Sequence, residues 1–220
     1  MGFHSTGRGT DREMMQLYYM AGASSLAAHI VLEWVQASYQ LVEMTPESLR
    51  SASFLGLNAV GKVPVLTHGG FTLTESVAIL CYLVDLNPAS NLLGGDTRSR
   101  AEALRWLAFL NTELHPSFRP LLARQAPDEA DAPAGHATAT AAARRAVREH
   151  LARLDRQLES RDWIAGMRSV ADPYLFVMFR WAVAMDVDLD GLRYLTAFAR
   201  RMYGDAGTRA ALQAEEGLAP

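Results

Sequence analysis

The sequence predicts a chain in two parts, a small α/β layer built on four strands followed by an all-helical second half. Within residues 15–86 the spacing of apolar residues switches repeatedly between the strand period of two and the helix period of 3.6. Within residues 97–220 only helical spacing is found. Residues 87–96 lie between these parts and contain Pro88 and the pair Gly94-Gly95, a composition typical of a linker. We therefore expect an α/β domain and a helical domain joined by this linker.

Size and composition exclude several classes of protein. The chain has 220 residues, a formal net charge of -3, 50% hydrophobic residues and one cysteine. A chain of this length buries roughly 70% of its unfolded surface, so it forms a full core without disulfides. The nearly neutral charge argues against binding to nucleic acid. A single cysteine excludes an internal disulfide and a cysteine-based zinc site, and the histidines lack the mutual spacing of metal ligands, so we expect no metal.

Residues 1–14 are expected to form a flexible extension. They are polar and rich in Gly, Ser, Thr and Arg, and they contain no apolar run long enough for a signal peptide. No stretch of the chain approaches the roughly 20 apolar residues that a membrane span needs. We therefore expect a cytoplasmic protein with no membrane partner.

The first domain, residues 15–86, is expected to follow the order βαβ and then ββα. The strands are predicted at residues 16–20, 39–43, 63–67 and 71–73, and the helices at residues 24–36, 46–55 and 74–85. His68, Gly69 and Gly70 are typical of a hairpin turn between the last two strands. This order predicts one small sheet with helices packed against it.

The second domain, residues 97–220, is expected to contain only helices. Two apolar stripes at helical spacing are Leu104, Leu107, Leu110, Leu114, Phe118 and Leu121, and then Val147, Leu151, Leu154 and Leu158. Pro116 and Pro120 predict kinks in the first helix, and residues 126–143 are expected to form a loop. A helix over residues 174–185 is preceded by Ser169-x-x-Asp172, the pattern of a capping box. Two further helices are predicted at residues 191–203 and 208–213.

Five blocks of sequence, in this order and spacing, resemble the cytosolic glutathione transferases, and are most similar to the bacterial beta class. They are MQLYYMAGASSLAAHI from Met15, NAVGKVPVL from Asn58, TLTESVAILCYL from Thr72, TELH from Thr112 and SVADPYLF from Ser169. The resemblance implies a thioredoxin-like first domain that binds glutathione as co-substrate. It also implies a helical second domain with a pocket for a small hydrophobic electrophile, and a homodimer.

The resemblance assigns five residues to glutathione binding. An extended peptide ligand can pair with the backbone at Val63, and a cis bond before Pro64, which is predicted here, would turn the N–H and C=O of Val63 toward the ligand. Ser76, at a helix start, suits the γ-glutamyl carboxylate, and Glu75 suits its ammonium group. Lys62 is within reach of the glycine carboxylate. The alternatives are an ordinary helix start for Glu75 and Ser76 and a solvated loop lysine for Lys62.

Ser24 and Ser25 begin the first helix, where the resemblance places the glutathione sulfur. The beta class usually carries a cysteine at the position of Ser24. A cysteine forms a mixed disulfide with glutathione, whereas a serine can only donate a hydrogen bond, so thiolate activation is the role we expect. The alternative is that these serines cap the helix, which is compatible with activation.

His115 follows the block Thr112-Glu113-Leu114 and corresponds to a histidine that beta-class enzymes place between their domains. There it would hydrogen-bond the sulfur or polarise the electrophile. The alternative is a structural histidine beside an apolar stripe. Cys81 lies in the helix that follows Glu75 and is interpreted as a small hydrophobic core residue.

The sequence therefore predicts a glutathione transferase in which Ser24, Ser25 and His115 activate the thiol for attack on an alkyl or aryl electrophile. Two alternatives stay open. One is a glutathione-dependent isomerase or disulfide reductase. The other is a noncatalytic interaction module of the same fold, which the serine at position 24 favours.

Overall fold

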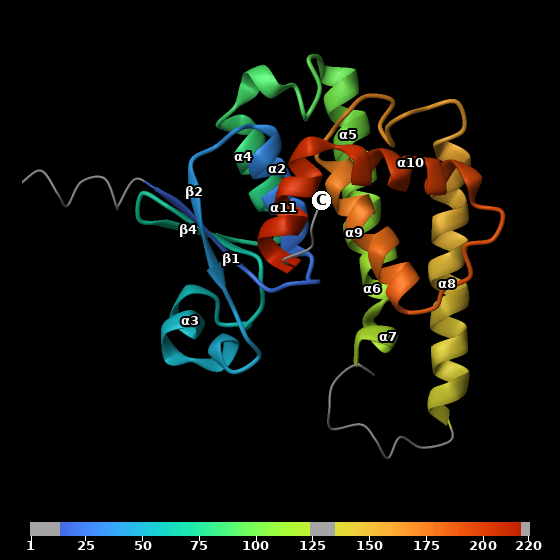
Figure 1. Ribbon diagram of the computed structural model, residues 1–220, viewed down its shortest axis with the longest axis horizontal. Helices are drawn as coiled ribbons and strands as arrows, with labels where there is room; N and C mark the ends of the chain where they lie inside the picture. The colour runs from blue at the N-terminus through green and yellow to red at the C-terminus, as the bar shows by residue number, and fades with distance from the viewer. Residues whose placement is uncertain (1–13, 124–134, 217–220) are drawn as a thin grey trace, which may run out of the picture. The chain divides into compact units, whose positions relative to one another are not determined.

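A computed structural model describes residues 14–123 and 135–216, which divide into two compact units (Figure 1). The first unit comprises the described residues up to Ser90 together with those from Ala206 onward, and the second is Asn91–Asp205. The division falls inside the predicted linker at residues 87–96. The domain limits of 15–86 and 97–220 concern segments that fold as separate domains, which this division into compact units does not test, and they stay a prediction. The predicted extension, apart from Met14, lies outside the described residues.

The first unit is built on the predicted four-stranded sheet. Its strands are β1 (Met15–Tyr19), β2 (Tyr39–Glu43), β3 (Val65–His68) and β4 (Phe71–Thr74), in the order β2-β1-β3-β4. β1 pairs in parallel with β2, and β3 pairs antiparallel with both β1 and β4. The third strand begins two residues later than predicted because Pro64 has no N–H to donate to the ladder. Leu17 and Leu66 face each other in the register and are both buried.

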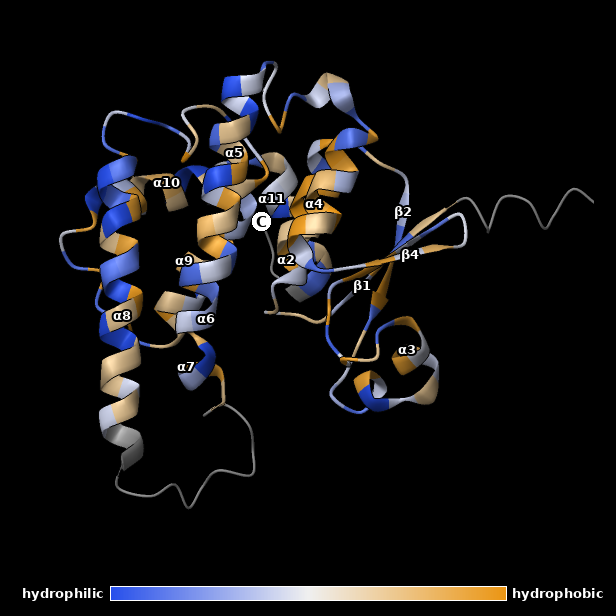
Figure 2. Cartoon of the chain, turned by 180° about the vertical axis from the view of Figure 1, so that it is seen from behind, coloured by the Kyte–Doolittle hydropathy of each residue, from blue (hydrophilic) through white to orange (hydrophobic). Residues whose placement is uncertain are grey.

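The helices of the first unit come from distant parts of the sequence. They are α2 (Ser25–Trp34), η1 (Ser48–Arg50), α3 (Ala52–Leu57), α4 (Ser76–Asp85), η2 (Pro88–Ser90) and α11 (Ala206–Glu216). The single weak helix predicted over 46–55 is wrong: Ser51 is extended and its hydroxyl accepts a hydrogen bond from Phe54 N–H, which starts a new helix. α2 packs against α4 and α11. Much of α2 and α4 is coloured hydrophobic in Figure 2, as expected of helices enclosed on several sides.

The second unit is all-helical, as predicted. Its elements are α5 (Thr97–Phe109), the π-helical η3 (Leu110–Leu114), α6 (His115–Ser117), α7 (Arg119–Ala123), α8 (Gly135–Gln157), α9 (Ala171–Ala184) and α10 (Arg193–Gly204). The two predicted stripes form its core, and only Leu104 among them is more than marginally exposed. The first stripe runs through α5, η3 and α6 without a gap and continues in α7 after a turn at Phe118. The π-helical η3 directly precedes His115 and Pro116, whose ring nitrogen cannot donate to the helix ladder, and the turn at Phe118 lies two residues before Pro120.

Two predicted boundaries in this unit are wrong. The loop expected over 126–143 ends earlier, because α8 already begins at Gly135 and alanines fill its first turns; residues 126–134 lie outside the described part. α9 begins at Ala171 and not at 174, since Pro173 fits the first turn of a helix.

The predicted capping box at the start of α9 forms in part. The Asp172 carboxylate accepts from Ser169 N–H at 2.7 Å and from the Ser169 hydroxyl at 3.1 Å. The serine hydroxyl in turn accepts from Ala171 N–H at 3.3 Å, not from Asp172. Asp172 also accepts from Ile164 N–H at 2.9 Å, so this buried carboxylate joins the preceding loop to the helix.

Within the described residues, no helix is long and apolar enough to cross a membrane. The same part of the chain holds no group of three or more His, Cys, Asp or Glu placed to bind a metal ion.

Candidate functional site

The turn between β1 and α2 gives Ser24 and Ser25 different surroundings. Ser25 is fully buried, and its hydroxyl lies 3.3 Å from Met20 N and 3.4 Å from Met20 O, so it joins the end of β1 to the helix. Ser24 is 7% exposed and directly precedes α2. Its hydroxyl makes no hydrogen bond with any described residue, and it does not cap the helix, so the capping alternative is wrong for Ser24.

The first turn of α2 favours a negative charge. The N–H groups of Ser24 and Ser25 have no acceptor among the described residues, and no acidic side chain occupies the first turn. Unpaired N–H groups and the aligned peptide dipoles give such a turn a partial positive charge. Together with the Ser24 hydroxyl, they are suited to an anionic sulfur or oxygen atom.

The Val63-Pro64 peptide bond is cis, which confirms the prediction. The pairing of β3 begins at Val65, and the Val63 N–H and C=O bond to no described residue. An extended peptide can therefore pair with the backbone here. Lys62 is exposed, and its carbonyl accepts from the Asn58 side-chain amide at 2.7 Å, which holds the loop before Val63.

Glu75 has a backbone conformation that the sequence did not reveal. Its φ of 70° and ψ of 118° lie in a region that costs a non-glycine residue on the order of 1–3 kcal/mol. Glu75 is exposed, and Ser76, the first residue of α4, is 9% exposed. Neither side chain has a hydrogen-bond partner among the described residues. The signal for this strain is absent from the sequence, because glycine, the usual marker of positive φ, does not stand there.

The strand register places the segments that carry Ser24, Val63 and Glu75 at the same end of the sheet. Tyr18, near the end of β1, is paired with Val65 at the start of β3, and Val65 is paired with Thr74 at the end of β4. The chain leading to Ser24, the Val63-Pro64 bond and Glu75-Ser76 therefore all leave the sheet at the same end. Seven of the eight predicted site residues belong to these segments of the first unit.

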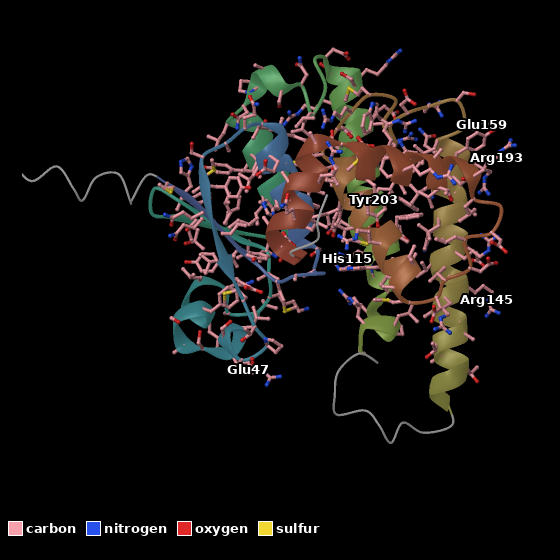
Figure 3. All side chains as sticks on the ribbon, in the orientation of Figure 1. Glu47, His115, Arg145, Glu159, Arg193 and Tyr203 are labelled. Atoms are coloured by element: carbon pink, nitrogen blue, oxygen red, sulfur yellow. The ribbon has the colours of Figure 1, made fainter. Side chains whose placement is uncertain are left out.

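His115, the eighth, belongs to the second unit and begins α6 (Figure 3). Its Nδ1 lies 2.5 Å from the Tyr174 hydroxyl, and its ring centroid is 5.1 Å from that of Trp181. The Tyr174 hydroxyl also lies 3.1 Å from Asn111 Oδ1, so Tyr174 joins His115 to Asn111. These supporting residues could not be predicted from the sequence, since Asn111 and Tyr174 are far apart along the chain. Participation of His115 in the same site as Ser24 stays a prediction.

Comparison with known proteins shows that this chain is similar to members of one family. Residues 13–85 match the family model described as glutathione S-transferase, N-terminal domain. A curated relative, glutathione S-transferase GST-4.5 of Xanthomonas campestris, is 44% identical over 203 residues, which cover 91% of this chain and 98% of the relative.

Solved structures agree over nearly the whole chain. A glutathione S-transferase from Xylella fastidiosa is 42% identical, with a TM-score of 0.87 over 93% of this chain and all of its own. A sphingomonad glutathione S-transferase complexed with glutathione is 40% identical, with a TM-score of 0.80 over 93% of this chain and 100% of that one. A bacterial beta-class enzyme from Sphingomonas chungbukensis is 36% identical, with a TM-score of 0.81 over 92% of this chain and 100% of that one. The identity and coverage of these matches show that the chain belongs to the glutathione S-transferase family.

Proposed function

We propose that this protein is a glutathione transferase that binds glutathione on the first unit and activates its thiol for attack on a small hydrophobic electrophile. One observation carries the proposal. The chain segments before α2, at Val63-Pro64 and before α4 leave the sheet at one end, and each offers donors that no described residue accepts. A ligand with an anionic sulfur, a peptide backbone and a carboxylate fits that set.

Each part of glutathione has a proposed partner. The Ser76 hydroxyl and N–H, at the start of the ten-residue helix α4, bind the γ-glutamyl carboxylate. The exposed Glu75 carboxylate binds the ammonium group. The Val63 N–H and C=O pair with the cysteinyl backbone beside Pro64, and Lys62 binds the glycine carboxylate.

The sulfur is proposed to lie at the first turn of α2. A thiol of pKa about 8.5 is only a few per cent ionised at pH 7, and lowering that value by about two units needs roughly 2.7 kcal/mol of preferential stabilisation of the thiolate. The Ser24 hydroxyl donates a hydrogen bond, the N–H groups of Ser24 and Ser25 add positive potential, and the thiol proton leaves to solvent. The thiolate then forms a bond to the electrophilic carbon as the leaving group departs, or adds to a polarised double bond, whose displaced electron pair takes up a proton from solvent.

Ser24 is proposed to occupy the position of the beta-class cysteine. A hydroxyl cannot form a mixed disulfide, so transfer chemistry is favoured over disulfide reduction through this residue. His115 is proposed to act on the sulfur or the electrophile from the helical unit, which would supply the apolar pocket. A homodimer is proposed as the working form.

The test is retention on immobilised glutathione followed by turnover of a panel of alkyl and aryl electrophiles. We expect retention, elution by free glutathione, and turnover that falls in Ser24→Ala and His115→Ala. Ser38→Ala changes an exposed serine between α2 and β2 and serves as the matched control. Retention without turnover on any electrophile would favour the interaction module, and turnover of disulfides that appears only in Ser24→Cys would confirm that the serine blocks that chemistry.

A further inference from the structure

A buried chain of hydrogen bonds joins α11, α2 and β2 in the first unit. His29 of α2 lies at its centre, with Nδ1 2.9 Å from Glu215 Oε1 and Nε2 2.8 Å from the Tyr39 hydroxyl. The Tyr39 hydroxyl also donates to Glu33. The side chains of His29 and Glu215 are both completely buried. Through Glu215, the last described helix of the chain is bonded to the helix that Ser24 precedes.

The proton positions in this chain follow from its geometry. Tyr39 has one hydroxyl proton and gives it to Glu33, so its oxygen accepts from Nε2–H of His29. Burial, then the hydrogen bond and charge of Glu33, raise the pKa of the Tyr39 hydroxyl and keep it a donor. At the other nitrogen, one proton is shared between Nδ1 and Glu215. The pair has zero net charge whichever atom holds that proton.

α11 covers the face of α2 along most of its length. Its buried residues Thr208, Ala211, Leu212 and Glu215 follow the helical spacing i, i+3, i+4, i+7. A Cβ at Gly207 would lie 2.7 Å from Trp34 Cδ1, so the backbone of α11 touches the end of α2 there. Glu215 meets His29, which is four residues after Ser25. The two helices therefore run antiparallel, and Glu215 contacts α2 about one turn from its start.

We propose that Glu215 and His29 are positioning residues for the reaction, which hold the first turn of α2 in the orientation that directs the Ser24 hydroxyl at the bound thiol. This inference rests on the proposed function. Ser24 has no hydrogen bond of its own to a described residue, so the helix backbone beneath it sets its direction. That backbone is held on one side by the Ser25 contact with Met20 and on the other by the His29–Glu215 pair.

Three variants separate positioning from general destabilisation. Glu215→Ala leaves His29 Nδ1 without this partner, and we expect the titration midpoint of the bound glutathione thiol to rise by about one pH unit, which is about tenfold less thiolate at low pH. We expect kcat to fall by a similar factor while KM for glutathione changes less than about threefold. Glu215→Gln recovers most of the shift, because its amide can donate to Nδ1 while Nε2–H still donates to Tyr39. Gln213→Ala, on the exposed face of α11, is the matched control.

The midpoint is read from thiolate absorbance near 240 nm as a function of pH. If Glu215→Ala does not fold, Tyr39→Phe removes the bond at the other ring nitrogen and is expected to shift the midpoint in the same direction, to a smaller extent.

The outcomes distinguish this inference from the proposed function. If the wild-type protein lowers the pKa of the thiol, and Glu215→Ala and Tyr39→Phe show the same titration midpoint as wild type, the positioning role is wrong. The proposed transferase function is then unaffected. A wild-type protein that does not bind glutathione overturns the proposed function. In that case, amide hydrogen exchange on the ligand-free protein still tests whether Glu215 holds the first turn of α2. Faster exchange at residues 25–29 in Glu215→Ala supports this role, and unchanged exchange overturns it.

Discussion

The hydroxyl groups of the two adjacent serines at the start of α2 have different surroundings. Ser25 Oγ is committed to the Met20 backbone, whereas Ser24 Oγ has no partner among the residues described and remains near the helix start. A hydroxyl already engaged with the protein stabilises the fold, and one without a partner is available to a ligand.

Replacement of these serines by alanine is expected to separate the two roles. In Ser24→Ala, loss of the donor raises the thiol midpoint and lowers kcat/KM about tenfold, with little change in stability. In Ser25→Ala, the free energy of unfolding falls by about 1 kcal/mol, since the hydroxyl bridge to Met20 is lost. Urea denaturation and thiol titration on both variants test this. Equal thiol midpoints in the two variants would contradict the assignment.

Glu75 combines a strained backbone with an exposed carboxylate. We expect Glu75→Gly and Glu75→Ala to raise KM for glutathione equally, by about tenfold, because both remove the partner of the ammonium group. Glycine tolerates positive φ, so Glu75→Gly is expected to be more stable than Glu75→Ala by about 1 kcal/mol. Steady-state kinetics and thermal unfolding provide the comparison, and a less stable glycine variant would show that the strain is not relieved there.

At the scale of elements, the start of α9 depends on one carboxylate. Asp172 accepts two backbone N–H groups, from Ile164 and Ser169, and it is fully buried. Burial raises the pKa of Asp172 to about 7, against the opposing effect of those hydrogen bonds. The helix is therefore anchored by a group whose charge is costly in the folded state.

This raised pKa predicts how stability depends on pH. Between pH of about 4 and 7 the folded protein keeps a proton on Asp172 that the unfolded chain has lost, so this group's contribution to the free energy of unfolding falls as pH rises. Asp172→Asn cannot titrate, and its NH2 group opposes a backbone N–H, so we expect it to be less stable than wild type by about 1–3 kcal/mol at pH 4. The difference is expected to shrink toward pH 7.

Denaturant titrations at several pH values measure that difference. Asp190→Asn, at an exposed carboxylate of the same unit, is the control and is expected to show a flat difference. A constant difference for Asp172→Asn across this range would contradict the role of burial.

Periodicity predicted most elements but not where their ends lie. The four strands and the two stripes beginning at Leu104 and Val147 were predictable because side-chain spacing records which face is buried. The π-helical turn at Leu110–Leu114 was not, because it depends on how the chain accommodates Pro116 within the packed unit. The sequence predicted candidate site residues from their type and position. It could not predict the strained backbone of Glu75 or the contact of Tyr174 with His115, because both depend on the three-dimensional fold.

At the scale of the whole molecule, sequence order and spatial grouping differ. The spacing of residues 208–213 correctly predicted a helix, but not that α11 would pack on α2, which ends 206 − 34 = 172 residues before α11 begins. No local pattern records that partner: His29 and Glu215 are separated by 186 positions. A lone histidine in a helix gave no indication that a carboxylate from the far end of the chain would meet it.

A chain that ends at Asp205 is expected to destabilise the first unit selectively. It uncovers His29 and Trp34, and we expect faster hydrogen exchange in α2 and β2 and weaker retention on glutathione, while α5 and α9 keep their protection. Gly207→Ala is a milder form of the same change: its Cβ collides with Trp34, at an expected cost of about 1–3 kcal/mol. Equal loss of protection in both units would contradict the grouping of α11 with the first.

The contact of α11 with α2 also means that the first unit stays incomplete during much of the protein's synthesis. Residues of the first unit up to Ser90 leave the ribosome early, but the helix that covers His29 ends at Glu216, which is 216 − 90 = 126 residues later. At about 5–20 residues per second, that gap lasts roughly 6–25 seconds. During it α11 does not yet cover His29 and the apolar face around it, so α2 is the segment where we expect a ribosome-associated chaperone to bind.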